Sequence, residues 1–390
     1  MKIVLTSDWH LGKNLYHQKL LSHQAKFFQE TFLHLLKDVK PDLLIVAGDI
    51  LDKPIPDQET IYFFEEFLKN LSTTKVKTLF ILGNHDSRRT SLHKYFMEYA
   101  DIHMVDDLRY LTNPLTLSGK RGEPINFYLL PYLPPYEILE KWSLSSSKNW
   151  ESVYSLKEAL NKIFINVKFL EPAILIGHFV LEEATFCGEE LFLKGFSIDY
   201  TLSQKLFTPF RYVFLGHLHR YQVHKEKFIY PGAPLPYAFE TFTEKRGVVL
   251  IEILGGAIIH QELIPLSPPY TLKYLRGSFQ DIMALPREEA YVKIILEEDR
   301  PIFDAHAQLK TKFPNLLFLD YAKENYENQV ISYTVQEELS ENSKLDLRAL
   351  FREFYNFVEN EEPNGEIWRI FESYLEAFYK KEHREGELCH

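Results

Sequence analysis

Cysteine is nearly absent from this sequence, whose 390 residues include only Cys187 and Cys389. Two cysteines cannot build a disulfide framework, and such sparse use suits the reducing cytosol, so we expect a cytoplasmic protein. Long apolar runs are also missing, since no stretch approaches the roughly 18 residues that a membrane span needs. The N-terminal apolar run ends at Leu5 and is too short for a signal peptide. We therefore expect neither a membrane protein nor a secreted disulfide scaffold.

Positive charge is scarce as well. The formal net charge is −11, which taken alone argues against a nucleic-acid partner, because such proteins neutralise phosphates with Lys and Arg. The distribution of charge weakens this objection. Residues 337–390 hold 14 acidic and 7 basic residues, so they carry −7 of the total. Two divalent cations would bring the remaining residues to about neutral, with positive potential concentrated at their site.

Five short polar clusters, each at the end of an apolar run, are the main functional signal in the chain. They contain Asp, Asn and His, and no Cys or Ser nucleophile. In open α/β sheets, ligand sites assemble at the carboxyl ends of parallel strands. Carboxylates, an amide and several imidazoles converging from five strand ends are typical of a two-metal hydrolytic centre. The clusters are Asp8-Trp9-His10, Gly48-Asp49, Gly83-Asn84-His85-Asp86, Gly177-His178 and Gly216-His217-Leu218-His219.

The order of predicted elements indicates an α/β protein of two or three units. Strands alternate with helices, which implies parallel sheets with right-handed crossovers. Two such halves predict a four-layer α/β/β/α sandwich over residues 1–264. The predicted strands are 3–6, 43–47, 78–82, 126–130, 173–176, 212–215, 227–230 and 247–254, and the predicted helices are 28–39, 61–71 and 156–167.

The pattern changes after Pro265. Residues 265–336 contain a predicted helix at 301–312 between strands at 291–296 and 329–335, which fits either a small α+β domain or an extension of the sandwich. Residues 337–390 contain two amphipathic helices separated by a break at Pro363. Such a helical hairpin has little core of its own, so its aromatic stripes must dock on another surface. That surface is either the protein's own body or a partner.

The clusters resemble the signature of the calcineurin-like metallophosphoesterase superfamily, which runs D-x-H, G-D, G-N-H-D/E, G-H, G-H-x-H. The resemblance is closer to SbcD-type DNA exonuclease subunits, and it covers roughly residues 1 to 335. It implies the four-layer sandwich, a small α+β capping domain that restricts which nucleic acids enter, and a C-terminal helical hairpin. The matching stretches are Thr6 to Gly12, Gly48 to Asp52, Gly83 to Ser87, Gly216 to Arg220 and Tyr230 to Pro234.

The resemblance also implies roles for individual residues. One carboxylate bridges two ions, each ion has three further ligands, and one histidine stabilises the transition state or protonates the leaving oxygen. Mixed imidazole and carboxylate ligands suit Mn²⁺, Fe or Zn²⁺, and the resemblance points to Mn²⁺. The bridge is Asp49, the first ion takes Asp8, His10 and His219, the second takes Asn84, His178 and His217, and the catalytic histidine is His85.

Basic residues beside these motifs are candidates for binding a phosphate backbone, although ordinary solvated charges would give the same pattern. They are Lys13, His17, Lys19, Lys53, Arg88, Arg89, Lys94 and Arg220. Asp86 has two candidate roles, orienting His85 or capping the following helix.

The resemblance favours docking of the tail on a coiled-coil ATPase of the SbcC type, and a homodimer is expected from the family. The predicted anchors are Leu347, Phe351, Phe354, Phe371 and Phe378.

We consider three functions. The first is a Mn²⁺-dependent DNA nuclease subunit, a 3′-to-5′ exonuclease on double-strand ends and an endonuclease on hairpins and single strands, acting in DNA repair, recombination and replication. The second is a small-molecule phosphodiesterase or a protein phosphatase. Protein phosphatases typically have Arg-Gly after G-D-x-x-D, whereas Lys53-Pro54 follows Asp52 here. The third is an inactive scaffold for the ATPase, which would have no need for the full ligand set.

Overall fold

The computed structural model divides the chain into two compact units, Met1–Ala322 and Lys323–His390. The boundaries predicted at 264 and 336 remain predictions. Arg88, Arg89, Lys94, Leu347, Phe354, Phe378 and the strand predicted at 329–335 lie outside the described residues. Those described are 1–87, 97–133, 137–138, 156–185, 201–239, 245–298, 300–322, 348, 351–352, 355, 362–365 and 367–372.

The first sheet of the larger unit has a parallel centre and an antiparallel edge. β1, β4, β5 and β6 run parallel, while β15 pairs antiparallel with both β1 and β16. The strands predicted in this region are confirmed, whereas β6 and β16 were not predicted. In sheet order the strands are β16 (Ala257–Pro265), β15 (Gly247–Leu254), β1 (Lys2–Thr6), β4 (Leu43–Ala47), β5 (Lys77–Ile81) and β6 (Ile102–Val105).

The second sheet repeats this plan. β8, β9, β12 and β14 run parallel, and β7 and β13 close the edges as antiparallel strands. The centre of each sheet is therefore parallel, as the alternation of strands and helices predicts. In order the strands are β13 (Gln222–His224), β14 (Phe228–Tyr230), β12 (Tyr212–Gly216), β9 (Ala173–His178), β8 (Pro124–Leu130) and β7 (Leu115–Ser118).

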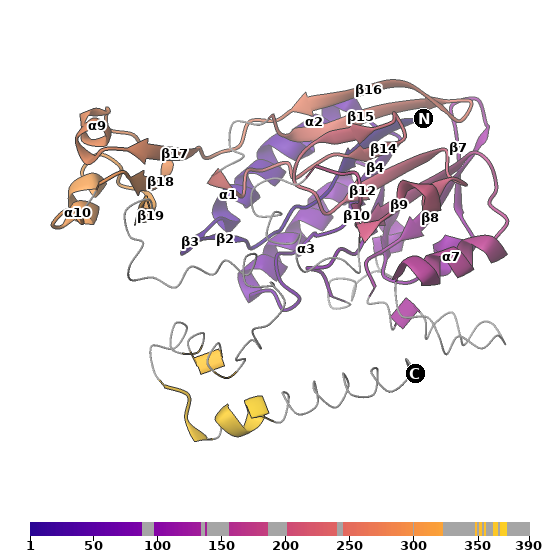
Figure 1. The fold of residues 1–390 in the computed structure, drawn as a ribbon. Helices are drawn as coiled ribbons and strands as arrows, with labels where there is room; N and C mark the ends of the chain where they lie inside the picture. The colour runs from indigo at the N-terminus through magenta and orange to yellow at the C-terminus, as the bar shows by residue number, and fades with distance from the viewer. Residues whose placement is uncertain are drawn as a thin grey trace. The chain divides into compact units, whose positions relative to one another are not determined.

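The two sheets pack face to face and helices cover their outer faces (Figure 1). Between the sheets, residues such as Ile3 and Ile45 from the first meet Phe127 and Ile174 from the second. The outer face of the first sheet packs on α1 (Leu21–Lys26), a π-helical turn (Phe27–Phe32), α2 (Leu33–Val39) and α3 (Gln58–Thr73). The outer face of the second sheet packs on α7 (Leu156–Asn166). The α/β sandwich is thus confirmed.

Two helices differ in detail from the prediction. The first begins at Leu21, seven residues earlier than Phe28, and ends where Lys40 turns into a left-handed conformation with φ 46°. In α3, Phe63 and Phe67 fill core positions, whereas Ile61 is 40% exposed. The prediction for Ile61 was wrong because the buried stripe of this helix passes through residues 60, 63, 64, 67, 68 and 71, and Ile61 lies beside it.

Residues 272–321 form a third, three-stranded parallel sheet with its own core. The strands are β17 (Leu272–Gly277), β18 (Tyr291–Leu296) and β19 (Leu316–Tyr321). Alternate residues of β18 pack with α9 (Phe279–Ala284) and α10 (Ala305–Lys310), which together cover one face. The predicted strand at 291–296 is confirmed. The helix predicted at 301–312 is shorter, because Asp304 adopts a left-handed φ of 51° directly before it.

In the smaller unit, described residues of the two predicted tail helices contact each other. The rings of Phe351 and Phe371 stack with centroids 4.0 Å apart, and the guanidinium of Arg348 lies 2.7 Å from the carboxylate of Glu372. Among the described residues, no helix has the length and apolar character required to cross a membrane.

Candidate metal centre

All eight predicted metal-binding and catalytic residues lie together, where carboxyl ends of strands from both sheets meet. Their side chains come from the segments that follow β1, β4 and β5 in the first sheet and from β9 and β12 with its following loop in the second. The grouping rests on contacts among Asp8, His10, Asp49, Asn84, His85, His178, His217 and His219.

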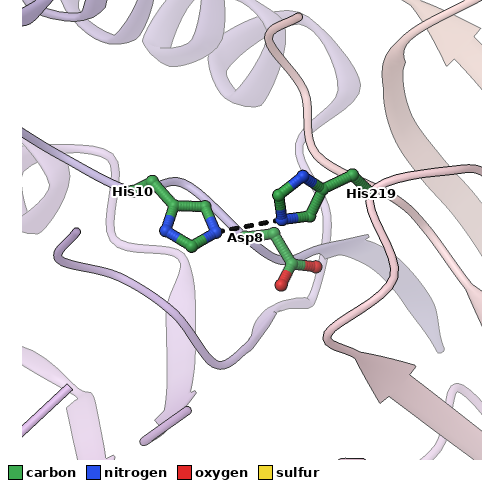
Figure 2. Close-up of side chains that lie close together, drawn as sticks. All are labelled: Asp8, His10 and His219. Carbon is green, nitrogen blue, oxygen red and sulfur yellow. Dashed lines mark hydrogen bonds between the residues drawn. The ribbon is translucent and has the colours of Figure 1, made fainter. Parts of the chain in front are cut away.

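One group within this centre consists of Asp8, His10 and His219, whose ligand-type atoms lie within 4.8 Å of one another. Figure 2 shows the two imidazoles facing each other beside the carboxylate, with their Nε2 atoms 3.1 Å apart. Asp8 and His10 are fully buried. Two imidazole nitrogens and a carboxylate within this distance of one another are a donor set suited to a transition-metal ion.

A second group consists of Asn84, His178 and His217. Asn84 Oδ1 lies 2.9 Å from His178 Nε2 and 2.8 Å from His217 Nδ1. His178 Nδ1–H donates to the carbonyl of Ala47 at 2.8 Å, so a neutral His178 directs a lone pair from Nε2 at the amide oxygen. Two facing acceptors require a proton or a cation between them. The residues present therefore fit a metal ion here too.

Asp49 lies between the two groups. Its Oδ2 is 3.7 Å from His10 Nε2 and 3.4 Å from His178 Nε2, and its Oδ1 accepts a hydrogen bond from the backbone N–H of His85 at 2.8 Å. Burial would raise the pKa of Asp49, but the imidazoles of His178 and His10 outweigh it and hold this pKa well below its ordinary value. Asp49 is consequently the permanent anion at the middle of the centre.

Strained backbone directs several of these side chains inward. Asp8, His10, Asp49 and His217 all have positive φ, at 54°, 45°, 51° and 94°. L-residues rarely adopt this region, and each instance costs free energy that the surrounding structure must supply. Asp8 N–H donates to the carbonyl of Gly48 at 3.0 Å, which helps to hold the first of these turns. Sequence patterns carry no signal for this strain.

Glycines in the motifs allow the two sheets to approach closely. At Gly48, where φ is 91°, an added Cβ would lie 2.2 Å from His178 Nδ1. At Gly216 it would lie 1.9 Å from the carbonyl oxygen of Ala47. Any larger residue would therefore push the His178 segment away from the Asp49 segment.

His85 is held by the loop after β4. Its Nδ1–H donates to the backbone carbonyl of Asp52 at 2.8 Å, which leaves Nε2 as its second functional nitrogen. The Asp52 carboxylate lies 3.4 Å from His10 Nδ1 and 3.2 Å from Lys13 Nζ. His10, Asp52 and His85 also have ligand-type atoms within 4.8 Å of one another, but the lysine already supplies a cation to this carboxylate.

Gln24 is a positioning residue that the sequence analysis missed. It is fully buried on α1, and its Nε2 donates to the carbonyl of His10 at 2.8 Å, while its Oε1 accepts from the N–H of Gly12 at 2.9 Å. The buried hydroxyl of Tyr237 lies 3.1 Å from the same Nε2. Gln24 thus fixes the loop that carries His10. The sequence did contain a signal for this role, because Gln24 is a polar residue spaced four positions from both Leu20 and Phe28, which are buried.

Asp86 joins two of the site loops, and the helix that it was predicted to cap lies in residues 88–96, outside the described residues. Its carboxylate accepts backbone N–H hydrogen bonds from Ile50 at 3.1 Å, Leu51 at 2.9 Å and Gly83 at 2.9 Å. It therefore ties together the loops that carry Asp49 and His85. Burial, assisted by the charge of Asp49, raises the pKa of Asp86 to about 7.

Protonation in the centre depends on burial and on Asp49. Burial raises the pKa of Asp8 to about 8, and Asp49 adds to the effect. Burial would lower the pKa of His178, but Asp49 outweighs it and raises the value to about 9. Burial lowers the pKa of His217 to about 3 and that of His219 well below its ordinary value, so both imidazoles are neutral at pH 7. Neutral imidazoles are the form that binds metals.

The predicted DNA-contacting residues are more dispersed. Lys13 pairs with Asp52, and its ammonium lies 5.6 Å from the centroid of the Tyr237 ring. His17, Lys53 and Arg220 are exposed near the site loops. Lys19 is exposed and lies 3.9 Å from the carboxylate of Asp57.

Comparison with known proteins identifies two family models along the chain. The model described as calcineurin-like phosphoesterase matches residues 1–221, and the model described as type 5 capsule protein repressor C-terminal domain matches residues 268–359. The chain is 27% identical over 362 residues to the SbcD subunit of the nuclease SbcCD of Staphylococcus epidermidis, covering 91% of this chain and 92% of that protein.

Similar solved structures have low sequence identity. A dimetal phosphatase from Danio rerio is 12% identical with a TM-score of 0.38, over 68% of this chain and 99% of that one. A protein from Thermus thermophilus is 11% identical with a TM-score of 0.36, over 67% of this chain and 98% of that one.

Proposed function

Because the chain belongs to the calcineurin-like phosphoesterase family, we propose that it is the nuclease subunit of an SbcCD-type complex and hydrolyses phosphodiester bonds of DNA. The family and the ligand-type groups make it a divalent-metal-dependent phosphodiester hydrolase. The observation that carries the proposal is the pair of donor groups on either side of the anionic Asp49.

In this proposal Asp49 would be a ligand shared by two divalent ions, most suitably Mn²⁺. Its position between His10 and His178 supports the bridging role. Asp8, His10 and His219 complete one ligand set, and Asn84, His178 and His217 complete the other. Divalent ions bound there supply an activated water and neutralise charge on the phosphate.

His85 would protonate the leaving oxygen or stabilise the transition state. Its Nδ1–H is committed to the carbonyl of Asp52, which fixes the ring. In the imidazolium form, with both nitrogens protonated, Nε2 would give its proton to the leaving oxygen or donate a hydrogen bond to the phosphate as negative charge develops. Asp86 supports this geometry indirectly, since it fixes the loop of Gly83 against that of Leu51.

The proposed DNA substrates follow from the resemblance to nuclease subunits of the SbcD type. We propose 3′-to-5′ exonuclease activity on double-strand ends and endonuclease activity on hairpins and single strands, in DNA repair, recombination and replication. A coiled-coil ATPase of the SbcC type would gate access and dock on the tail, with Phe351 and Phe371 among the anchors. The active form would be a homodimer.

Digestion of end-labelled duplex and hairpin DNA with Mn²⁺, with and without the ATPase, tests the proposal. Chelation with EDTA and the Asp49→Asn variant are the negative controls. We expect Mn²⁺-dependent products from wild type alone on single-stranded regions, and ATPase-dependent shortening of duplex ends. Hydrolysis of bis(p-nitrophenyl) phosphate without cleavage of any DNA would instead indicate the small-molecule phosphodiesterase.

A further inference from the structure

A row of aromatic rings leads from the third sheet to the rim of the metal centre. The centroids of Phe318 and Tyr16 are 5.1 Å apart, and those of Tyr16 and Phe239 are 5.8 Å apart. The row ends beside the site loops, because Tyr237, two residues from Phe239, has its ring 5.7 Å from that of His10. The family motifs assign no role to these rings.

The central ring of the row stands on an exposed turn. Tyr16 lies between β2 (Asn14–Leu15) and β3 (Gln18–Lys19), with a left-handed φ of 53°. It is 40% exposed. A partly exposed tyrosine in a strained backbone conformation has a cost in stability, which a binding role would explain. His17 follows in the same turn and is exposed, while Lys19 on β3 is exposed and pairs with the carboxylates of Asp57 and Glu59.

The third sheet extends the row with a cation between two rings. Tyr274, Lys293 and Phe318 are directly paired across β17, β18 and β19. The ammonium of Lys293 lies 5.7 Å from the centroid of Tyr274 and 5.5 Å from that of Phe318. Lys293 lies between the buried Val292 and Ile294 on β18, so it and its two cross-strand partners lie on the face opposite α9 and α10.

We propose that this row binds a single DNA strand, with unpaired bases stacking on Tyr16 and Phe318 and a phosphate beside Lys293. Interleaved aromatic and cationic side chains are the usual platform for single strands, because every base has a π-face. Phe239 is 1% exposed, so it would support Tyr16 from within the core and would not itself touch the strand. This inference rests on the proposed nuclease function and specifies which form of DNA the site receives.

Fluorescence anisotropy tests base stacking directly. A thymidine oligonucleotide and an abasic strand of equal length would be titrated with the full-length protein in EDTA, so that both strands stay intact. Tyr16→Leu and Phe318→Leu remove the ring and keep an apolar side chain, while Tyr16→Phe keeps the ring. Phe303→Ala is the matched control, because Phe303 is an aromatic residue of residues 272–321 that is 91% exposed and outside the row.

We expect Tyr16→Leu to raise the Kd for the thymidine strand by about 5-fold or more and to leave the Kd for the abasic strand unchanged. Tyr16→Phe and Phe303→Ala should match wild type on both strands. Equal weakening on both strands, or no weakening on either, would overturn the proposal. Cleavage with Mn²⁺ is scored separately. If wild type binds thymidine strands through Tyr16 but cleaves no DNA, the nuclease function fails and the binding row stands.

Discussion

Replacing Asp49 with Asn should affect the protein both with and without metal. Asp49 Oδ2 lies 3.4 Å from His178 Nε2, and the pKa of His178 is about 9 against an ordinary 6.5. A difference of this size corresponds to about 3 kcal/mol of net stabilisation of the protonated imidazole, after burial has opposed it. Because the pKa of Asp49 is depressed, its ionised carboxylate stabilises the fold above about pH 4, and this stability is lost as the pH falls. Because the pKa of His178 is raised, its protonated imidazole stabilises the fold below about pH 6.5, and this stability is lost as the pH rises through about 9.

Asp49→Asn removes this pair. The free energy of unfolding of the metal-free variant at pH 7 should therefore be about 1–3 kcal/mol lower than that of the wild type. Circular dichroism with urea at pH 7 and at pH 10 measures the loss, which should shrink at pH 10 where His178 is neutral. Adding Mn²⁺ should raise the Tm of wild type and leave that of the variant nearly unchanged. DNA cleavage should fall below one tenth of wild type.

Asp57→Asn is the matched control. Asp57 is a carboxylate that caps α3 through the N–H of Thr60, and Asn caps helices equally well. This variant should keep wild-type stability, metal response and cleavage. If Asp49→Asn binds two ions with unchanged affinity and cleaves above one tenth of wild type, then Asp49 is not the bridge.

The same geometry leads to four further predictions. His85→Gln should lower turnover by roughly 10²-fold or more while metal content, measured by elemental analysis, stays unchanged; loss of metal would make His85 a ligand. Gln24→Met should weaken Mn²⁺ binding by about 10-fold in a titration with little change in secondary structure, because His10 loses its support; unchanged binding would contradict this. Mn²⁺ affinity should rise between pH 7 and 9, because Asp8 and His178 must release the protons that their pKa values of about 8 and about 9 retain; calorimetry in two buffers counts those protons, and no release would refute the reasoning. Phe351→Ala with Phe371→Ala should abolish binding of the ATPase in a pull-down and leave Mn²⁺-dependent single-strand cleavage intact, as should deletion from Lys344 onward, because every proposed ligand lies before Arg220; retained binding would exclude the tail as the docking site.

The strands that carry the centre were predictable because they are short apolar runs ending in polar residues. Ile3, Ile45 and Ile174 are buried between the sheets, and such continuous apolar strands leave a strong pattern in the sequence. The convergence of Asp8, Asn84 and His217 followed from a general property of parallel sheets, whose carboxyl strand ends meet at one edge.

Other features depend on contacts that no local pattern encodes. Ile61 matched the helical spacing of α3, yet its exposure was decided by which stripe faces the sheet. Asp86 satisfies backbone groups of a loop 35 residues away, so its role required the packed structure. The left-handed turns at Asp8 and Asp49 are imposed by the surrounding hydrogen bonds, since aspartate does not favour this conformation strongly enough for it to be predicted.

Reconstitution with counted metal ions tests the central claim most directly. Metal-free protein would receive increasing equivalents of Mn²⁺, and single-turnover cleavage of an end-labelled single strand would be measured at each step. If Asp49 joins two ions in one hydrolytic centre, cleavage should remain low up to one equivalent and reach its plateau at two. Full cleavage at one equivalent, or none at any concentration, would contradict the account.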